Sequence, residues 1–153
     1  MNKYCYTTLL GTDDYIFGVL GLYYSLKKVH SKYPLIVIVP DNISDKTLSI
    51  LEKNNILYKQ VKNRTFSDNI CQINYKSTLN KFHCFDLIEY EKVLFLDADV
   101  VVYKNIDYYF LLTPFSAFRG YAGTITGGIF LIKPEKDFAK KIFEEYSHCE
   151  NDE

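Results

Sequence analysis

The sequence predicts an α/β domain with a mostly parallel β-sheet and helices on both faces of that sheet. Two short runs, residues 35–39 and 93–96, consist entirely of Val, Ile, Leu and Phe. Strands that are buried on both faces of a parallel sheet have this continuous apolar composition. Segments with helical spacing of apolar residues alternate with such runs, and this alternation with short connections favours parallel pairing.

Length and composition indicate one domain. The chain has 153 residues, of which 48% are hydrophobic, and a formal net charge of −1. This much apolar material can bury one core, and the near-neutral charge argues against nucleic acid as the main partner. No apolar run approaches the roughly 20 residues that span a bilayer. The four scattered Cys residues form no CxxC pair and follow no secretory signal, so we expect free thiols and a cytoplasmic location. The 16% aromatic content leaves room for a homodimer interface.

In the first half of the chain, turn and capping residues separate the expected elements. The segment Gly11-Thr12-Asp13-Asp14 combines a turn with helix-capping side chains, so a strand should end before it and a helix should follow it. The expected order is a strand at residues 4–10, a helix at 15–30, a strand at 35–39, a helix capped by Ser44 or Asp45 that runs to Asn54, a strand at 56–61 and a polar loop at 62–77.

The second half continues the alternation. We expect a helix at residues 78–90, a strand at 92–96, a short helix or turn at 105–112, a strand at 127–132 and a helix from Pro134 to His148. Ligands of such sheets bind at the carboxyl ends of the strands. Residues 9–12 and 97–99 both follow strands, so we expect one nucleotide to bridge them.

Two carboxylates directly follow the apolar run at residues 93–96. Asp97 and Asp99 are separated by one residue, and a buried charge costs several kcal/mol unless it is paired or bound to a metal. Mn²⁺ and Mg²⁺ prefer hard oxygen ligands and are often held by one or two carboxylates together with substrate phosphates. The pattern therefore favours a divalent cation that carries a phosphorylated ligand. In an isolated Asp-x-Asp, one carboxylate can instead cap a turn while the other faces water.

Several segments, in the correct order, resemble glycogenin-like glycosyltransferases of family 8. They are residues 6–15, the helical segment 78–84, the strand and carboxylates at 93–99, the segment 105–107 and the strand 127–134. Together they cover essentially the whole chain. The resemblance implies a GT-A fold, and a glycosyltransferase that moves a hexose from a UDP-sugar with retention of configuration in the presence of Mn²⁺ or Mg²⁺.

The resemblance also implies roles for individual residues. Asp97 and Asp99 would hold the metal on the diphosphate, and Lys81 would act as a catalytic residue that stabilises charge on the leaving diphosphate. A Lys on a surface helix is usually only solvated, so this role rests on the resemblance. The expected donor-binding residues are Leu9, Gly11, Thr12, Tyr15, Lys81, Asp97, Ala98, Asp99, Thr126, Gly127 and Gly128.

Departures from the family pattern leave the donor sugar and the acceptor open. The Asn and Ser that the family places before a Gly are Thr126 and Gly127 here, which removes an amide and a hydroxyl from the expected sugar site. The family's later acidic motif and metal-binding His have no counterpart up to Glu153. We therefore expect residues 1–153 to form the nucleotide-sugar-binding domain without the family's C-terminal segment, and sugar transfer to be slow or absent. Protein, glycan and small polyol acceptors all fit.

Two other functions compete with this interpretation. The departures also suit a catalytically inactive UDP-sugar-binding or assembly module. Residues 97–101 further match the DxDx[TV] motif of haloacid dehalogenase-type phosphatases. That motif usually opens its domain, whereas here it lies two-thirds along the chain.

Overall fold

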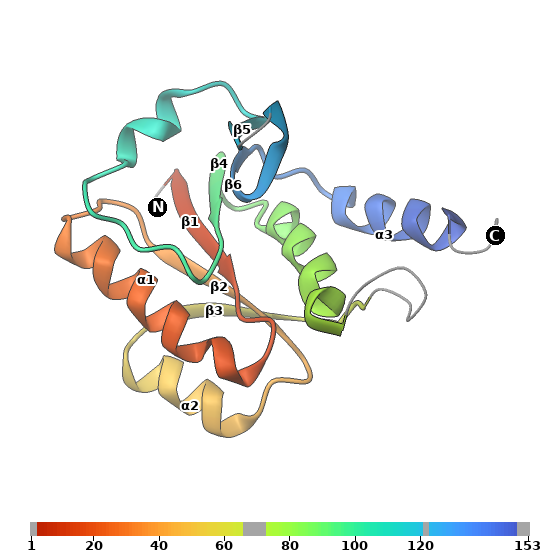
Figure 1. Ribbon diagram of the computed structural model, residues 1–153, viewed down its shortest axis with the longest axis horizontal. Helices are drawn as coiled ribbons and strands as arrows, with labels where there is room; N and C mark the ends of the chain where they lie inside the picture. Colours follow the sequence, from red (N-terminus) through yellow and green to blue (C-terminus); the bar gives the residue numbers. More distant parts are fainter. Residues whose placement is uncertain (1–2, 66–72, 121–122, 150–153) are drawn as a thin grey trace.

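Six strands form one sheet between two layers of helices (Figure 1). The computed structural model describes residues 3–65, 73–120 and 123–149. The sheet order is β3-β2-β1-β4-β6-β5. The elements are β1 (Tyr4–Leu9), η1 (Asp13–Tyr15), α1 (Ile16–Lys28), β2 (Leu35–Pro40), α2 (Asp45–Lys53), β3 (Leu57–Val61), η2 (Ile73–Asp86), β4 (Lys92–Leu96), η3 (Asp107–Leu111), β5 (Ser116–Arg119), β6 (Ile125–Ile132) and α3 (Phe138–Cys149).

The mostly parallel α/β sheet predicted from the sequence is confirmed. β1 pairs in parallel with both β2 and β4, and β2 pairs in parallel with β3. β6 runs antiparallel to both β4 and β5. The sequence did not predict β5, because this four-residue edge strand is largely exposed and carries no apolar run. Its pairing depends on backbone contacts with β6.

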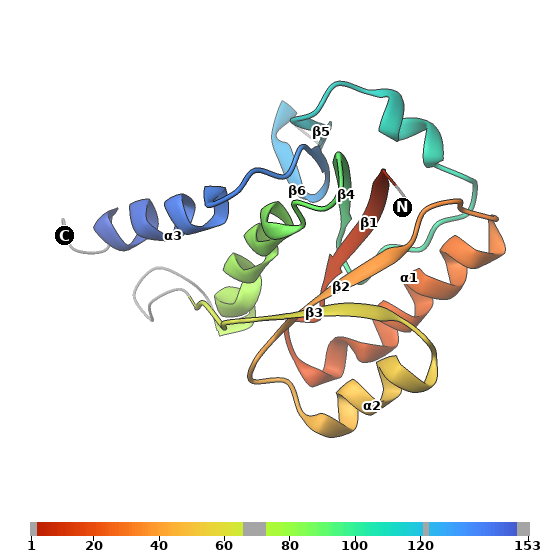
Figure 2. The same cartoon turned by 180° about the vertical axis from the view of Figure 1, so that it is seen from behind.

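The two faces of the sheet pack against different helices, as the views from both sides show (Figures 1 and 2). On one face, α1, α2 and η3 contribute Leu22, Leu51 and Phe110 to the core. On the other face, η2 and α3 contribute Leu79 and Phe143. Neighbouring residues at positions 35–39 of β2 and 93–96 of β4 point alternately to the two cores, so all of these positions are apolar.

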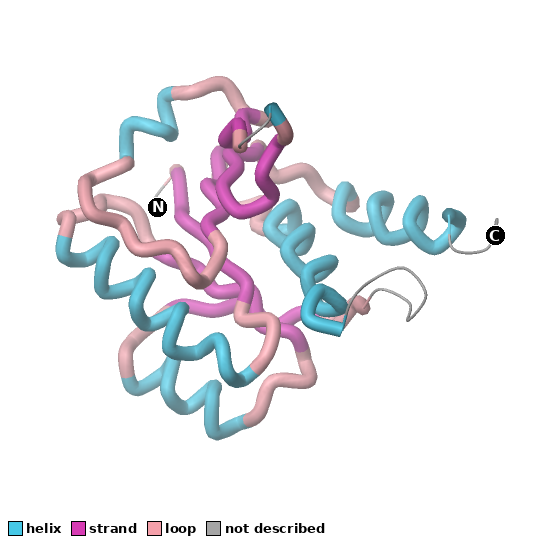
Figure 3. Tube along the Cα trace, viewed as in Figure 1, coloured by secondary structure: helices cyan, strands magenta, loops and turns pink. Residues whose placement is uncertain are grey.

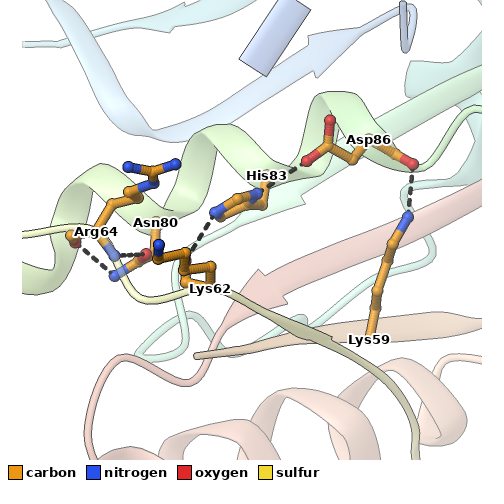
Figure 4. Close-up of polar contacts among 6 residues, drawn as sticks. All are labelled: Lys59, Lys62, Arg64, Asn80, His83 and Asp86. Carbon is orange, nitrogen blue, oxygen red and sulfur yellow. Dashed lines mark hydrogen bonds and ion pairs between the residues drawn. The ribbon is translucent and has the colours of Figure 1, made fainter. Parts of the chain in front are cut away.

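The helix η2 differs from the prediction at both ends. It begins at Ile73, inside the segment predicted as a loop, and ends at Asp86 rather than at residue 90. Polar contacts hold it to β3 and to the chain that follows β3 (Figure 4). Lys59 Nζ donates to the Asp86 carbonyl at 2.6 Å, and Asn80 Oδ1 accepts from the Arg64 amide at 2.7 Å. Such contacts leave no hydrophobic periodicity in the sequence. Residues 66–72 of the predicted loop lie outside the described part.

The last helix also begins later than predicted. Pro134 is buried just after β6, and α3 begins only at Phe138. Asp137 has a φ of 63°, a left-handed conformation that interrupts a helix. The first helix ends in the same way, because His30 has a φ of 54° where the sequence predicted the last helical residue.

The segment after β4 lies along α1 and appears as a long loop in Figure 3. The Val102 amide donates to Ser25 Oγ at 3.1 Å, and Asn105 Nδ2 donates to the Val29 carbonyl at 3.2 Å. At the start of this loop, a Cβ added to Gly18 would lie 2.6 Å from the Ala98 carbonyl oxygen. The bare Cα of Gly18 therefore allows α1 to approach the backbone between the two carboxylates.

We predict opposite effects for alanine at the two glycines of α1. Gly21→Ala should raise the free energy of unfolding by about 0.5–1 kcal/mol, because no atom lies within 4 Å of the added Cβ and Ala favours the helix. Gly18→Ala should lower it by about 1–3 kcal/mol, because the Ala98 backbone must move. Urea denaturation of both variants measures the difference, and equal stabilisation would show that α1 does not press on this loop.

Asp107 joins η3 to β1 and to the α1–β2 turn. Its carboxylate accepts from Tyr6 Oη at 2.7 Å, from Ser31 Oγ at 2.6 Å and from the Lys32 amide at 3.0 Å. Burial by itself raises the pKa of Asp107, but the hydrogen bonds from Ser31, Tyr6 and Lys32 outweigh it, so the pKa lies below its ordinary value. The native state therefore favours the charged carboxylate.

Asp107→Asn should destabilise the protein by about 1–2 kcal/mol near neutral pH, because charged hydrogen bonds are lost. The native pKa is lowered, so this contribution is complete above the unfolded value of about 3.9 and is lost as the pH falls below it. In thermal melts, the wild type should therefore be more stable than the variant at neutral pH, and this difference should disappear at acid pH. Glu91→Gln, which breaks only the exposed pair with Lys3, serves as the control; a difference that stays constant with pH would contradict the prediction.

Candidate functional site

A cavity of about 300 Å³ opens at the carboxyl ends of β1 and β4. It brings together nine of the residues predicted to bind the donor, and they come from β1 and its turn, η2, the loop after β4, and β6. The lining consists of Leu9, Gly11, Tyr15, Ser77, Thr78, Lys81, Asp97, Ala98, Asp99, Gly127 and Gly128. Charged groups in this lining are two carboxylates and one ammonium.

The loop after β4 presents Asp97 and Asp99 to this cavity. The Asp97 amide donates to the Gly128 carbonyl at 2.8 Å, and the Val100 amide donates to the Asp97 carbonyl at 3.1 Å, which closes a tight turn. Ala98 is buried against Gly18, whereas Asp99 is exposed and the Asp97 side chain is 42% exposed. The small residue Ala98 therefore packs against α1, and the carboxylates of Asp97 and Asp99 on either side of it line the cavity.

Lys81 enters the same cavity from η2. Its Nζ atom lies 3.4 Å from Asp97 Oδ1 and 3.1 Å from the Gly127 carbonyl oxygen. It also lies 5.4 Å from the centroid of the Phe95 ring. The side chain is only 13% exposed, so Lys81 is held by protein groups and is not an ordinary solvated surface lysine.

The donor set fits a divalent cation such as Mn²⁺ or Mg²⁺. Asp97 and Asp99 offer hard carboxylate oxygens, which can hold such a cation together with phosphate oxygens. A Cβ on Gly128 would lie 2.8 Å from Asp97 Oδ2, so the bare glycine makes room for this carboxylate. Over the described ranges, no three His, Cys, Asp or Glu side chains gather as a metal site.

The turn after β1 forms the other wall of the cavity. Leu9 and Gly11 line it directly, and Tyr15 is 50% exposed at its edge. A Cβ on Gly11 would lie 2.8 Å from Ser77 Oγ, so this glycine allows η2 to approach the turn. Thr12, in contrast, is exposed at the start of η1 and does not line the cavity.

Thr126 also lies outside the lining. Its hydroxyl donates to the Phe118 carbonyl of β5 at 3.3 Å, which holds the side chain against the sheet edge. Sequence reasoning missed Ser77 and Thr78 as lining residues. Ser77 gave no signal, because it lay at the end of a polar segment predicted as a loop. Thr78 opened the segment that resembles the family, but no role followed from that.

His83 is a structural residue. Its Nδ1 lies 2.8 Å from Asp86 Oδ2 and its Nε2 lies 3.1 Å from the Lys62 carbonyl (Figure 4). The ring is buried and packs against Phe143. Both ring nitrogens are thus occupied away from the cavity.

Comparison with known protein families identifies the family of this chain. The family model described as Glycosyl transferase family 8 matches residues 6–149. The chain belongs to glycosyltransferase family 8. This membership removes the support for the phosphatase alternative, whose motif overlaps residues 97–101.

Curated relatives of this family 8 chain are longer proteins. Galactinol synthase 3 of Arabidopsis thaliana is 36% identical over 114 residues, which cover 71% of this chain and 34% of the relative. Inositol phosphorylceramide glucuronosyltransferase 1 of the same plant is 25% identical over 92% of this chain and 27% of its own length. The chain thus spans about a third of the first relative's length and about a quarter of the second's.

Solved structures of glycosyltransferases share the fold. The apo form of GlyE from Streptococcus pneumoniae TIGR4 superposes with a TM-score of 0.66 at 19% identity, over 99% of this chain and 39% of that protein. The galactosyltransferase LgtC, in complex with donor and acceptor sugar analogues, gives 0.67 at 18% identity over 96% of this chain and 65% of LgtC. These neighbours are GT-A glycosyltransferases, so the GT-A fold expected from the sequence is confirmed. Among the described helices of the family 8 chain, none is long and apolar enough to cross a membrane.

The two glycines of β6 provide a matched pair of variants for this site. In Gly128→Ala the new Cβ must displace the Asp97 carboxylate, which can swing without cost to the core, so binding of UDP with Mn²⁺ should weaken about tenfold at unchanged stability. In Gly127→Ala the nearest atom is Lys81 Nζ at 3.6 Å, an ordinary contact, so binding should be nearly unchanged. Calorimetric titration measures both. Equal affinities for the two variants would show that the position of Asp97 does not matter.

Proposed function

We propose that this chain binds the donor of a metal-dependent glycosyltransferase, which transfers a hexose from a UDP-sugar with retention of configuration. One observation carries the proposal. Two carboxylates and one largely buried ammonium converge in a single cavity at the carboxyl ends of two parallel strands. This charge pattern suits a diphosphate that arrives with a divalent cation.

The nucleoside would lie against the turn after β1. Tyr15 offers a half-exposed ring to the base, and Leu9 offers an apolar contact. Gly11 and Ala98 carry little or no side chain, so the backbone on both sides can approach the ribose. Ser77 and Thr78 add hydroxyls from η2 that can bond to ribose or phosphate oxygens.

Asp97 and Asp99 would hold the cation, which when bound supplies positive charge next to the diphosphate. Lys81 would act on the leaving group. Its ammonium already lies in the cavity and is shielded from water, so charge that develops on the departing phosphate meets a fixed cation at low reorganisation cost. This makes Lys81 the proposed catalytic residue of the described chain.

The bare backbone of Gly127 and Gly128 would form the floor under the transferred sugar. The names of the relatives include a galactinol synthase and a glucuronosyltransferase, and LgtC is a galactosyltransferase. A hexose donor agrees with these names. We also propose a cytoplasmic location, because Cys5 and Cys84 are free buried thiols.

The first test is nucleotide binding. UDP should bind the wild-type chain, Mn²⁺ should tighten that binding about tenfold or more, and EDTA should reverse the gain, because the cation links the carboxylates to the diphosphate. Asp99→Asn should remove the metal dependence in a folded protein. Asp137→Asn is the control, since Asn tolerates the left-handed backbone there. Calorimetry that finds UDP affinity indifferent to EDTA would refute the metal role.

Hydrolysis of the donor then separates an enzyme from an inactive binding module. UDP-glucose and UDP-galactose are incubated with the chain and Mn²⁺, and release of UDP is measured. Slow release that disappears in Lys81→Ala supports the enzyme. Tight UDP binding with no release from either donor supports the binding module instead.

A further inference from the structure

The strongest unexplained feature of the cavity is the pairing of Lys81 with a proposed metal ligand. Lys81 Nζ lies 3.4 Å from Asp97 Oδ1. The second oxygen, Oδ2, lies against the Cα of Gly128, where an added Cβ would come within 2.8 Å. Because the ammonium already lies beside this carboxylate, a cation that binds Asp97 competes with Lys81 for it.

The charges in the cavity sharpen this competition. The two carboxylates and Lys81 together leave one net negative charge in the lining. A divalent cation alone would change this to one net positive charge beside a poorly hydrated ammonium, which is unfavourable at short range. A cation that arrives with a diphosphate brings its own negative charge, and that charge offers Lys81 a new partner.

Lys81 can leave Asp97 without losing all its contacts. The Gly127 carbonyl lies 3.1 Å from Nζ, and the centroid of the buried Phe95 ring lies 5.4 Å from it. The ammonium needs only a small shift toward the cavity to exchange one anion for another, because a flexible four-carbon stem carries it.

We infer that Lys81 is the counter-ion that occupies Asp97 until a metal–diphosphate pair arrives, so that cation and nucleotide bind cooperatively. The inference rests on the proposed function, and it adds that Lys81 lowers the affinity of the site for a metal ion without nucleotide. By thermodynamic linkage, the factor by which Mn²⁺ raises the affinity for UDP equals the factor by which UDP raises the affinity for Mn²⁺. Removing the charge of Lys81 should strengthen binding of the metal alone and weaken its coupling to UDP.

The test titrates Mn²⁺ alone into the wild type and into Lys81→Met, with the free cation followed by electron paramagnetic resonance. Lys81→Met should bind Mn²⁺ about three- to tenfold more tightly than the wild type, as expected for loss of a partly buried competing charge. Lys81→Gln removes the same charge and can still donate to the Gly127 carbonyl, so it replaces the Met variant if that one does not fold. Lys140→Met is the matched control, because it breaks a 3.5 Å pair with Glu144 on α3 and should leave Mn²⁺ affinity within about twofold.

A second titration adds UDP. The factor by which UDP tightens Mn²⁺ binding should fall about tenfold in Lys81→Met. Mn²⁺ affinity that is unchanged or weaker in both charge-removing variants would overturn the inference, as would no Mn²⁺ binding to any variant. Failure of the proposed function looks different: UDP would then bind none of the proteins, while the metal-only comparison would still decide the role of Lys81.

Discussion

The parallel pairing of β1 with β4 is the constraint on which the site depends. The register places Thr7 opposite Phe95, so both strands end at the same edge of the sheet and their loops diverge there. β1 also pairs with β2 on its other side, which makes this the point where the chain order of the sheet reverses. Side chains do not fill such a crevice, because the connections leave it in opposite directions.

Close backbone approach then brings the remaining elements to this crevice. Gly18 allows α1 to reach the Ala98 carbonyl, Gly11 allows η2 to reach the turn after β1, and Gly128 allows β6 to reach Asp97. At Gly18 the close contact is with backbone, whereas at Gly11 and Gly128 the bare Cα leaves room for the side chains of Ser77 and Asp97. A domain with a sizeable buried core can keep three such glycines at the site, although Gly18 and Gly128 slightly weaken the helix and the strand that hold them.

The polar contacts of η2 matter for function because this helix carries Lys81. Asn80 is fully buried, and its side-chain Nδ2 donates to the Asn63 side chain and to the Arg64 and Ser77 carbonyls. These directional bonds fix the rotation of η2 about its axis and its position along that axis. Apolar packing alone would allow the helix to shift along its axis. The backbone of Lys81, the next residue, is therefore held in place, and its ammonium reaches Asp97 from there. This fixed position makes competition between Lys81 and a cation possible.

The sequence by itself determined the α/β class, most strands, and the carboxylates at the end of β4, because continuous apolar runs and capping residues act locally. The capping of α2 is an example: the sequence allowed Ser44 or Asp45 as the cap, and Ser44 Oγ accepts from the Thr47 amide. Only the tertiary structure decided where η2 begins, that β5 exists, that Thr12 and Thr126 lie outside the cavity lining, and that Lys81 pairs with Asp97. These features depend on polar contacts and edge pairing between residues far apart in the chain. Such contacts leave no periodic pattern in the sequence. A hydrogen bond needs only one partner at one position, whereas a buried helix or strand face needs apolar residues at regular spacing.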